Sequence, residues 1–248
     1  MAKRRWRWLL LLLPLAAAVG FVAWAEGGPG PTPEALAALA SDAQVQVRAD
    51  FGWAFSPVAS EPTVGLAFYP GGRVDPRAYA PAARAVAAQG YLVVIVPVPL
   101  RLAVLAPDRA TAAMAQHPQV QRWAVGGHSL GGAMAARYAF SHPQQVQGLA
   151  LWAAYPSSSD DLSARPLEVV SIYGTLDGLA KPDKMEASRP LLPPGTRWAA
   201  IEGGNHAQFG WYGPQSGDNP ASISPQAQTE QVVAATVDLL ARLAARDR

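Results

Sequence analysis

The sequence predicts an α/β fold with a mainly parallel central sheet flanked by helices. From about Glu34 onward, short apolar segments alternate with alanine-rich segments of helical pattern. Residues 91–99 are rich in β-branched side chains and apolar on both faces, as a buried central strand of a parallel sheet is. Regular alternation of strands and helices is typical of a parallel sheet that is covered on both faces.

Each expected element has its own boundary signals. Residues 43–51 alternate with period two, which is typical of an edge strand. The helix expected over 79–90 ends at Gly90, a candidate C-terminal cap, and the helix over 107–118 is bounded by prolines. The remaining expected strands are 63–72, 120–127, 146–156, 167–174 and 196–203, and the remaining expected helices are 130–143 and 224–247.

The composition excludes several classes of site and partner. The 248 residues are 50% hydrophobic, which suits one large domain or two small ones. The absence of cysteine excludes disulfides, thiolate metal sites and a cysteine nucleophile. The net charge is +2, but Lys3, Arg4, Arg5 and Arg7 all precede the first acidic residue, Glu26. Without these four, 16 basic residues face 18 acidic ones, so we expect no nucleic-acid partner.

Residues 1–25 are predicted to be either a signal peptide or an N-terminal membrane anchor with a transmembrane helix. A basic cluster precedes an uncharged apolar run over residues 8–25, whose length is near the roughly 17–25 residues of an anchor. The end of this run, "AWA", also fits a small-residue cleavage site. Both alternatives place the rest of the chain outside the cytoplasm: membrane-anchored if the segment is kept, and secreted or periplasmic if it is cleaved. Residues 26–33 are predicted to be a Gly/Pro linker, and 34–248 the folded domain.

Three reactive side chains each follow a different expected strand. In chain order they are Ser129, Asp177 and His206. Ligands of parallel sheets bind beyond the carboxyl ends of the strands, so these side chains are expected at one edge. A serine nucleophile needs a neighbouring base, and the base needs a group that orients it. The sequence therefore predicts that Ser129 is the nucleophile, His206 the base and Asp177 the orienting carboxylate.

The spacing around Ser129 is G-x-S-x-G, with Gly127 before it and Gly131 after it. A nucleophile on a strained strand-to-helix turn needs such small neighbours, because strand and helix approach closely there. The helix that begins at Leu130 would direct free N–H groups at a developing oxyanion. Tight packing of a glycine-rich turn explains the same spacing. The accompanying Asp177 and His206 favour the catalytic interpretation.

The segments "GGHSLGG", "YGTLDG" and "GGNHAQFGWYG" resemble the nucleophile, acid and histidine motifs of the α/β-hydrolase fold family. The resemblance covers essentially the whole chain after the linker, and is closest to the compact, cap-less branch near the dienelactone-hydrolase-like proteins. That branch often has a cysteine where Ser129 stands, so a dienelactone substrate is not implied. By the same resemblance, "FYPGGRVDP" supplies an oxyanion donor, Gly72 or Arg73, that acts with Leu130. Which of Gly71, Gly72 and Arg73 donates stays open.

The substrate site is expected to be open or shallow. Only about a dozen residues, 153–166, precede the acid-bearing strand, too few for a separate cap domain. Tyr155, Phe209, Trp211 and Tyr212 are candidate substrate-binding side chains, and simple packing explains each of them equally well.

The remaining polar residues carry weaker signals. His128 is expected to pack or to line the pocket mouth, because it and Ser129 point apart on their turn. Residues 213–224 form a polar loop that could cover the edge of the site. No spacing of a metal site or of a phosphate-binding loop is present, so no metal and no cofactor is predicted.

The predicted function is that of a serine hydrolase that cleaves a small-molecule carboxylic ester through an acyl-enzyme. Thioester and amide substrates stay open. Two alternatives stay open as well: a non-catalytic binding or scaffold protein of the cell envelope with the same fold, and an acyltransferase. The sequence does not indicate an oligomeric state.

Overall fold

A computed structural model describes residues 2–245, and for residues 2–12 it describes the backbone alone. Met1 and residues 246–248, at the ends of the predicted segments 1–25 and 34–248, lie outside the described residues. The described chain folds around an eight-stranded sheet in the order β1-β2-β4-β3-β5-β6-β7-β8. The strands are β1 (Val45–Arg48), β2 (Trp53–Pro57), β3 (Val64–Tyr69), β4 (Leu92–Ile95), β5 (Arg122–His128), β6 (Gly148–Trp152), β7 (Glu168–Gly174) and β8 (Arg197–Ile201).

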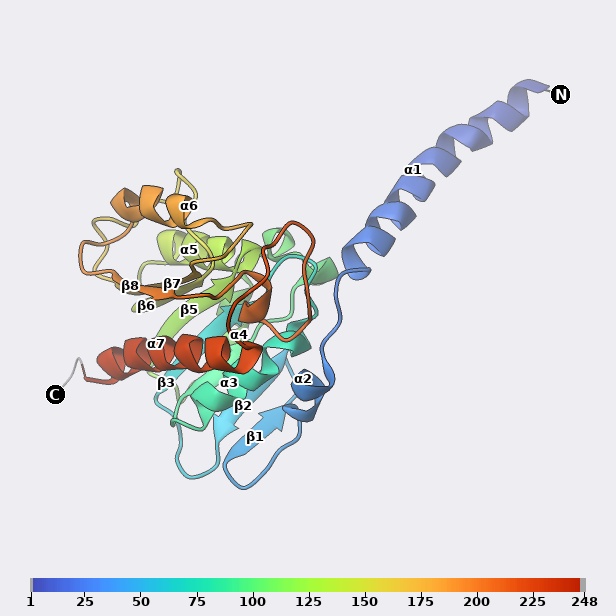
Figure 1. The fold of residues 1–248 in the computed structure, drawn as a ribbon. Helices are drawn as coiled ribbons and strands as arrows, with labels where there is room; N and C mark the ends of the chain where they lie inside the picture. The colour runs from blue at the N-terminus through green and yellow to red at the C-terminus, as the bar shows by residue number, and fades with distance from the viewer. Residues whose placement is uncertain (1, 246–248) are drawn as a thin grey trace.

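Helices cover both faces of this sheet (Figure 1). They are α1 (Ala2–Glu26), α2 (Pro33–Ala37), α3 (Ala80–Ala87), α4 (Arg109–Ala115), α5 (Leu130–Ser141), α6 (Pro182–Ala187) and α7 (Pro225–Ala245). Helices α3 and α7 lie side by side on one face, and α4 and α5 pack on the other. Successive side chains of β3 alternate between the two cores: Leu66 and Phe68 join the first, and Ala67 and Tyr69 join the second. The predicted α/β fold is confirmed.

Strands β3 to β8 are parallel to one another, whereas β1 and β2, at one edge of the sheet, pair antiparallel with each other and β2 pairs antiparallel with β4. Strand β2 is not among the predicted strands, because the half-buried segment 53–57 lacks a period-two pattern. It pairs with β4, so the predicted central strand is parallel to β3 on one side and antiparallel to β2 on the other. Strand β4 is also shorter than the predicted 91–99, since prolines at 97 and 99 cannot continue the ladder.

The N-terminal helix α1 projects away from the body (Figure 1). Its last turn contacts the loops after β3 and β4: Arg73 Nε donates to the Trp24 carbonyl at 2.9 Å, and Arg101 pairs with Glu26 at 3.1 Å. The helix runs one residue into the predicted linker, and α2 begins at its last residue. Among the residues whose side chains the structure describes, no helix is long and apolar enough to cross a membrane.

The connection between β6 and β7 is short and irregular. Residues 153–167 form no helix or strand, so no additional domain separates the nucleophile turn from the acid-bearing strand. This confirms the prediction of a fold without a separate cap domain. The carboxyl edge of the parallel strands is therefore left to loops, and the candidate site lies there.

Candidate active site

Ser129 is the single residue between β5 and α5, and its backbone is strained. Its φ is +52° and its ψ is −123°, a conformation that side-chain-bearing residues rarely adopt. Its N–H donates to the Trp152 carbonyl of β6 at 3.0 Å, and its carbonyl accepts the Ala133 N–H of α5 at 3.1 Å. These bonds hold the turn in a form that leaves the Ser129 side chain half-buried, at the carboxyl edge of the sheet.

The glycines around Ser129 are required by space. A Cβ on Gly127 would lie 2.5 Å from the Gly131 carbonyl carbon, and one on Gly131 would lie 2.3 Å from the carbonyl oxygens of Tyr69 and Pro70. A Cβ on Gly132 would lie 2.3 Å from that of Ala154. Real Cβ atoms do not approach so closely, so strand, turn and helix meet here only because these residues are glycines.

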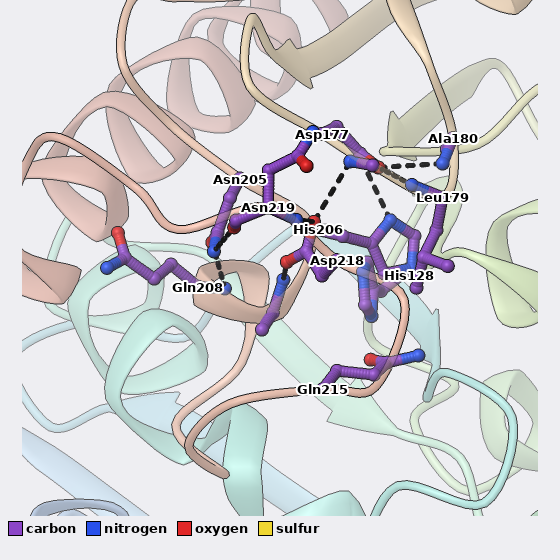
Figure 2. A network of polar contacts seen from close by, with 12 residues as sticks. His128, Asp177, Leu179, Ala180, Asn205, His206, Gln208, Gln215, Asp218 and Asn219 are labelled. Atoms are coloured by element: carbon purple, nitrogen blue, oxygen red, sulfur yellow. Dashed lines mark hydrogen bonds and ion pairs between the residues drawn. The ribbon is translucent and has the colours of Figure 1, made fainter.

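Asp177 and His206 follow β7 and β8 and form a buried pair (Figure 2). Asp177 Oδ2 lies 2.8 Å from His206 Nδ1, and the two side chains are 0% and 1% exposed. Asp177 Oδ1 accepts the backbone N–H groups of Leu179 at 2.8 Å and Ala180 at 2.7 Å, which fixes the carboxylate. The pairing holds His206 Nδ1, so Nε2 is the ring nitrogen left for chemistry.

Ser129 is placed near this pair by its neighbour His128, whose ring centroid lies 4.5 Å from that of His206. In the structure as described, no hydrogen bond joins Ser129 Oγ to His206 Nε2. The structure therefore brings together the predicted base and acid and sets the strained serine one residue from a ring that touches the base. Hydrogen bonds to catalytic serines are often long in ligand-free enzymes and shorten when substrate binds.

The loop after β3 leaves one amide free beside the start of α5. The Gly71 N–H donates to a buried tyrosine hydroxyl at 2.9 Å, and the Arg73 N–H donates to the Arg101 carbonyl at 2.8 Å. Within the described residues, the amides of Gly72 and Leu130 have no such acceptor. A Cβ on Gly72 would lie 3.0 Å from Leu130 Cδ2, so these two residues are neighbours. Of the three loop candidates, Gly72 is thus the one with an available N–H.

His128 is buried among aromatic rings, as expected of a packing residue. It is 1% exposed, and its ring stacks on Phe209 at 5.6 Å between centroids. Its Nδ1 lies 2.9 Å from the Tyr79 hydroxyl, while Nε2 makes no hydrogen bond of normal geometry. Burial, and then the charge of neighbouring His206, lower the pKa of His128 well below its usual value, so the ring is neutral.

Of the four predicted substrate-binding aromatic residues, two are buried and two have accessible surface. Phe209 and Tyr212 are 3% and 6% exposed and pack around His128, so they offer almost no surface to a substrate. Tyr155 is 37% exposed on the loop after β6. Trp211 lines a cavity of about 590 Å³ formed with the polar loop 213–224, but Ser129, Asp177 and His206 do not line this cavity.

Two residues that the sequence analysis missed hold the loops after β7 and β8 in place. Asp218 accepts the N–H of Ala207 at 2.8 Å and of Gly178 at 3.0 Å, the residues that directly follow the paired histidine and aspartate (Figure 2). Gln228 of α7 exchanges two hydrogen bonds with the Asn205 backbone, at 3.0 and 2.8 Å. The sequence signal for Gln228 is a glutamine on the buried face of an amphipathic helix, whereas Asp218 lies in a polar loop and has no distinguishing signal.

The carboxylate oxygens of Asp177 and Asp218 already accept hydrogen bonds from other groups of the protein. Both oxygens of Asp177 and both of Asp218 accept hydrogen bonds from backbone N–H groups or from His206. Among the residues that the structure describes, no three His, Asp or Glu side chains are arranged to hold a metal ion.

Comparisons with known proteins agree with this architecture. The profile of the family described as "Alpha/beta hydrolase family" matches residues 65–230. A structure titled as a predicted CIB-like hydrolase from Thermoplasma acidophilum aligns with a TM-score of 0.58 at 16% identity, covering 80% of this chain and 99% of that one. The esterase domain of a Rhodothermus marinus protein aligns with a TM-score of 0.56 at 15% identity, covering 78% and 97%. No curated protein matches the sequence.

Proposed function

The chain belongs to the alpha/beta hydrolase family, and we propose that it is a serine hydrolase that cleaves a carboxylic ester through an acyl-enzyme. The observation that carries this proposal is the buried Asp177–His206 pair, set beside the strained Ser129 turn at one edge of the sheet. A fixed carboxylate, an oriented imidazole and a serine on a nucleophile turn are the parts that acyl transfer requires.

In the first half of the reaction, Ser129 Oγ attacks the ester carbonyl and His206 Nε2 takes the serine proton. Asp177 holds the imidazole through Nδ1 and stabilises the imidazolium that forms. The tetrahedral intermediate collapses, the C–O bond to the alcohol breaks, and His206 gives its proton to the leaving oxygen. Water then attacks the acyl-enzyme by the same route, which releases the acid and restores Ser129.

The negative charge of the tetrahedral intermediate falls on the former carbonyl oxygen. Gly72 lies against the Leu130 side chain, and the amides of both residues have no acceptor within the described residues, so they are the donors we propose for this oxyanion. The positive end of α5 adds to the attraction. Arg73 is not included, because its N–H already donates to Arg101.

The substrate we propose is a small ester with an apolar part. The loops after β6 and β7 expose Tyr155, Leu176 and Leu179, which are 37%, 36% and 40% exposed. Leu176 and Leu179 flank Asp177 in sequence, so apolar surface lies close to the acid of the pair. A panel of p-nitrophenyl esters of increasing acyl length would test this, with an optimum above acetate as the expected result.

A fluorophosphonate probe tests the proposed function, because it reacts covalently with activated serines. The wild-type chain should be labelled at Ser129, and Ser129→Ala should lose both labelling and esterase turnover while it keeps its circular dichroism spectrum. Ser157→Ala, at an exposed serine on the loop after β6, is the matched control and should behave as wild type. An unlabelled wild type would favour the non-catalytic scaffold alternative, and ester products formed with added alcohols would favour acyl transfer.

A further inference from the structure

We propose that Tyr79 and His128 form a positioning pair: the Tyr79 hydroxyl holds the oxyanion loop at Gly71, and the His128 ring bonded to the same hydroxyl supports the base His206. The inference rests on the proposed function, since it deepens the account of how the oxyanion donors are placed. Both side chains are 1% exposed, and neither contributes to the nucleophile, base or acid. Tyr79 lies just before α3, and His128 is the last residue of β5, so the pair joins two distant segments of the chain.

The Tyr79 hydroxyl makes two hydrogen bonds with an assignable direction. The Gly71 N–H donates to it at 2.9 Å, and His128 Nδ1 lies 2.9 Å from it. A neutral tyrosine has one O–H to donate, and among the described residues His128 Nδ1 is the acceptor within hydrogen-bond distance of it, so we assign that proton to the Tyr79–His128 bond. His128 is then the neutral tautomer with its proton on Nε2.

The geometry around Gly71 shows how tightly the loop is held. A Cβ on Gly71 would lie 2.7 Å from the Tyr79 hydroxyl oxygen and 2.8 Å from His128 Nδ1. The loop backbone therefore lies directly against the pair. Gly72, which has the free amide, is the next residue. The direction in which the Gly72 N–H points therefore depends on the position of Gly71.

The other side of the pair faces the base. The His128 ring lies 4.5 Å from that of His206 between centroids (Figure 2), and it also stacks on Phe209 at 5.6 Å. The groups that face His128 are Tyr79 and Tyr212, besides His206 itself, and no carboxylate contacts its ring in the described residues. A neutral ring here supports the imidazole of His206 without repelling the imidazolium that forms during acyl transfer.

The pair therefore couples two parts of the proposed mechanism that the sequence places far apart. Moving the Tyr79 hydroxyl would release the Gly71 amide and leave His128 Nδ1 without its donor. The oxyanion donor and the support behind the base would be lost together. This is the role of a positioning residue, because neither Tyr79 nor His128 needs to touch the substrate.

The substitution Tyr79→Phe tests the clamp, because it keeps the ring that packs on Phe68 and removes the hydroxyl. We expect kcat to fall by at least about tenfold, towards the ~10²–10³-fold cost of losing an oxyanion donor, with KM almost unchanged. Tyr138→Phe is the matched control: it also removes a buried tyrosine hydroxyl, one that bonds Thr111 and Gln145 away from the site. It should leave kcat unchanged.

Two further measurements separate positioning from a general loss of stability. His128→Asn keeps an acceptor near the position of Nδ1 but removes the ring beside His206, so it should retain more of kcat than His128→Leu. His128→Leu loses both and should lower kcat at least as far as Tyr79→Phe. Nitrogen NMR of the wild type should show an unprotonated His128 Nδ1 at pH 7, independently of any activity. A protonated His128 Nδ1 would overturn this inference but not the proposed function. So would an unchanged kcat in Tyr79→Phe when the wild type is labelled by the probe. An unlabelled wild type would overturn the proposed function and this inference with it.

Discussion

Asp177 Oδ2 and His206 Nδ1 lie 2.8 Å apart, and the two side chains are 0% and 1% exposed. The contact joins the loops after β7 and β8, which are neighbouring parallel strands whose carboxyl ends meet at one edge. A carboxylate buried this completely needs hydrogen-bond donors to both of its oxygens. Besides His206, two backbone N–H groups donate to Asp177. The geometry ties the orientation of the imidazole to a single carboxylate.

Asp177→Asn should therefore lower kcat sharply while the protein stays folded. Asparagine preserves the shape, but its amide cannot hold the same tautomer of His206 or stabilise the imidazolium. We expect a loss of about 10⁴-fold, as for the comparable substitution in a serine protease triad. Asp161→Asn, at an exposed aspartate, is the control for a lost carboxylate and should keep wild-type kcat. If Asp177→Asn kept more than a tenth of the activity, the acid would have to be another residue.

Gly131→Ala should destabilise the protein, because the new methyl group would lie 2.3 Å from the carbonyl oxygens of Tyr69 and Pro70. Overpacking of this kind costs about 1–3 kcal/mol, and more where the contact is with the backbone. The midpoint of urea unfolding would report the loss. Gly195→Ala is the matched control, since no atom lies within 4 Å of its added Cβ. Equal midpoints for the two variants would contradict the close approach of α5 to β3.

Asp218→Ala should loosen the loops that carry Asp177 and His206 at once. Two backbone N–H groups, of Gly178 and Ala207, would lose a charged acceptor, and each such bond is worth about 1.5–3 kcal/mol before water replaces part of it. We expect a lower kcat and faster hydrogen exchange in residues 177–180 and 205–209. Asp218→Asn, which keeps one acceptor oxygen, should fall between the variant and the wild type. Glu61→Ala, at an exposed loop residue, controls for the change of charge. Unchanged exchange in both segments would show that Asp218 does not hold them.

The stability of the protein should fall as the pH falls below about 6.5, the ordinary pKa of histidine. Burial lowers the pKa of His128 in the folded state, so the unfolded chain takes up this proton first. One such group removes about 1.4 kcal/mol of the free energy of unfolding per pH unit. Urea unfolding at pH 7.5 and pH 5.5 would measure the change.

His128→Asn should show a smaller decrease over the same interval. The comparison isolates His128 from His117, whose pKa is also lowered by burial. A wild type and variant with identical pH dependence would mean that His128 is not buried as a neutral ring.

The order of strands, helices and turns along the chain could be predicted from the sequence, because most of these elements have a clear local sequence pattern. The β-branched run that became β4, the alanine-rich helices and the glycines around Ser129 predict the alternation and the nucleophile turn. The positions of Asp177 and His206 after separate strands also indicated a common edge, since parallel strands end on the same side. Strand β2 was not predicted, because it is held by its pairing with β1 and β4 rather than by a pattern of its own.

The contacts that refine the site are long-range, and the sequence alone did not indicate them. Spacing left Gly71, Gly72 and Arg73 equivalent as oxyanion donors, and hydrogen bonds from Gly71 to Tyr79 and from Arg73 to Arg101 distinguish them. Tyr79 and His128 are 49 residues apart in sequence. Local propensity and hydrophobic pattern act over a few residues, so they determined the order of strands, helices and turns. Which amide is free and which ring supports the base depended on atoms from distant segments, and only the packing of the tertiary structure brings those atoms together.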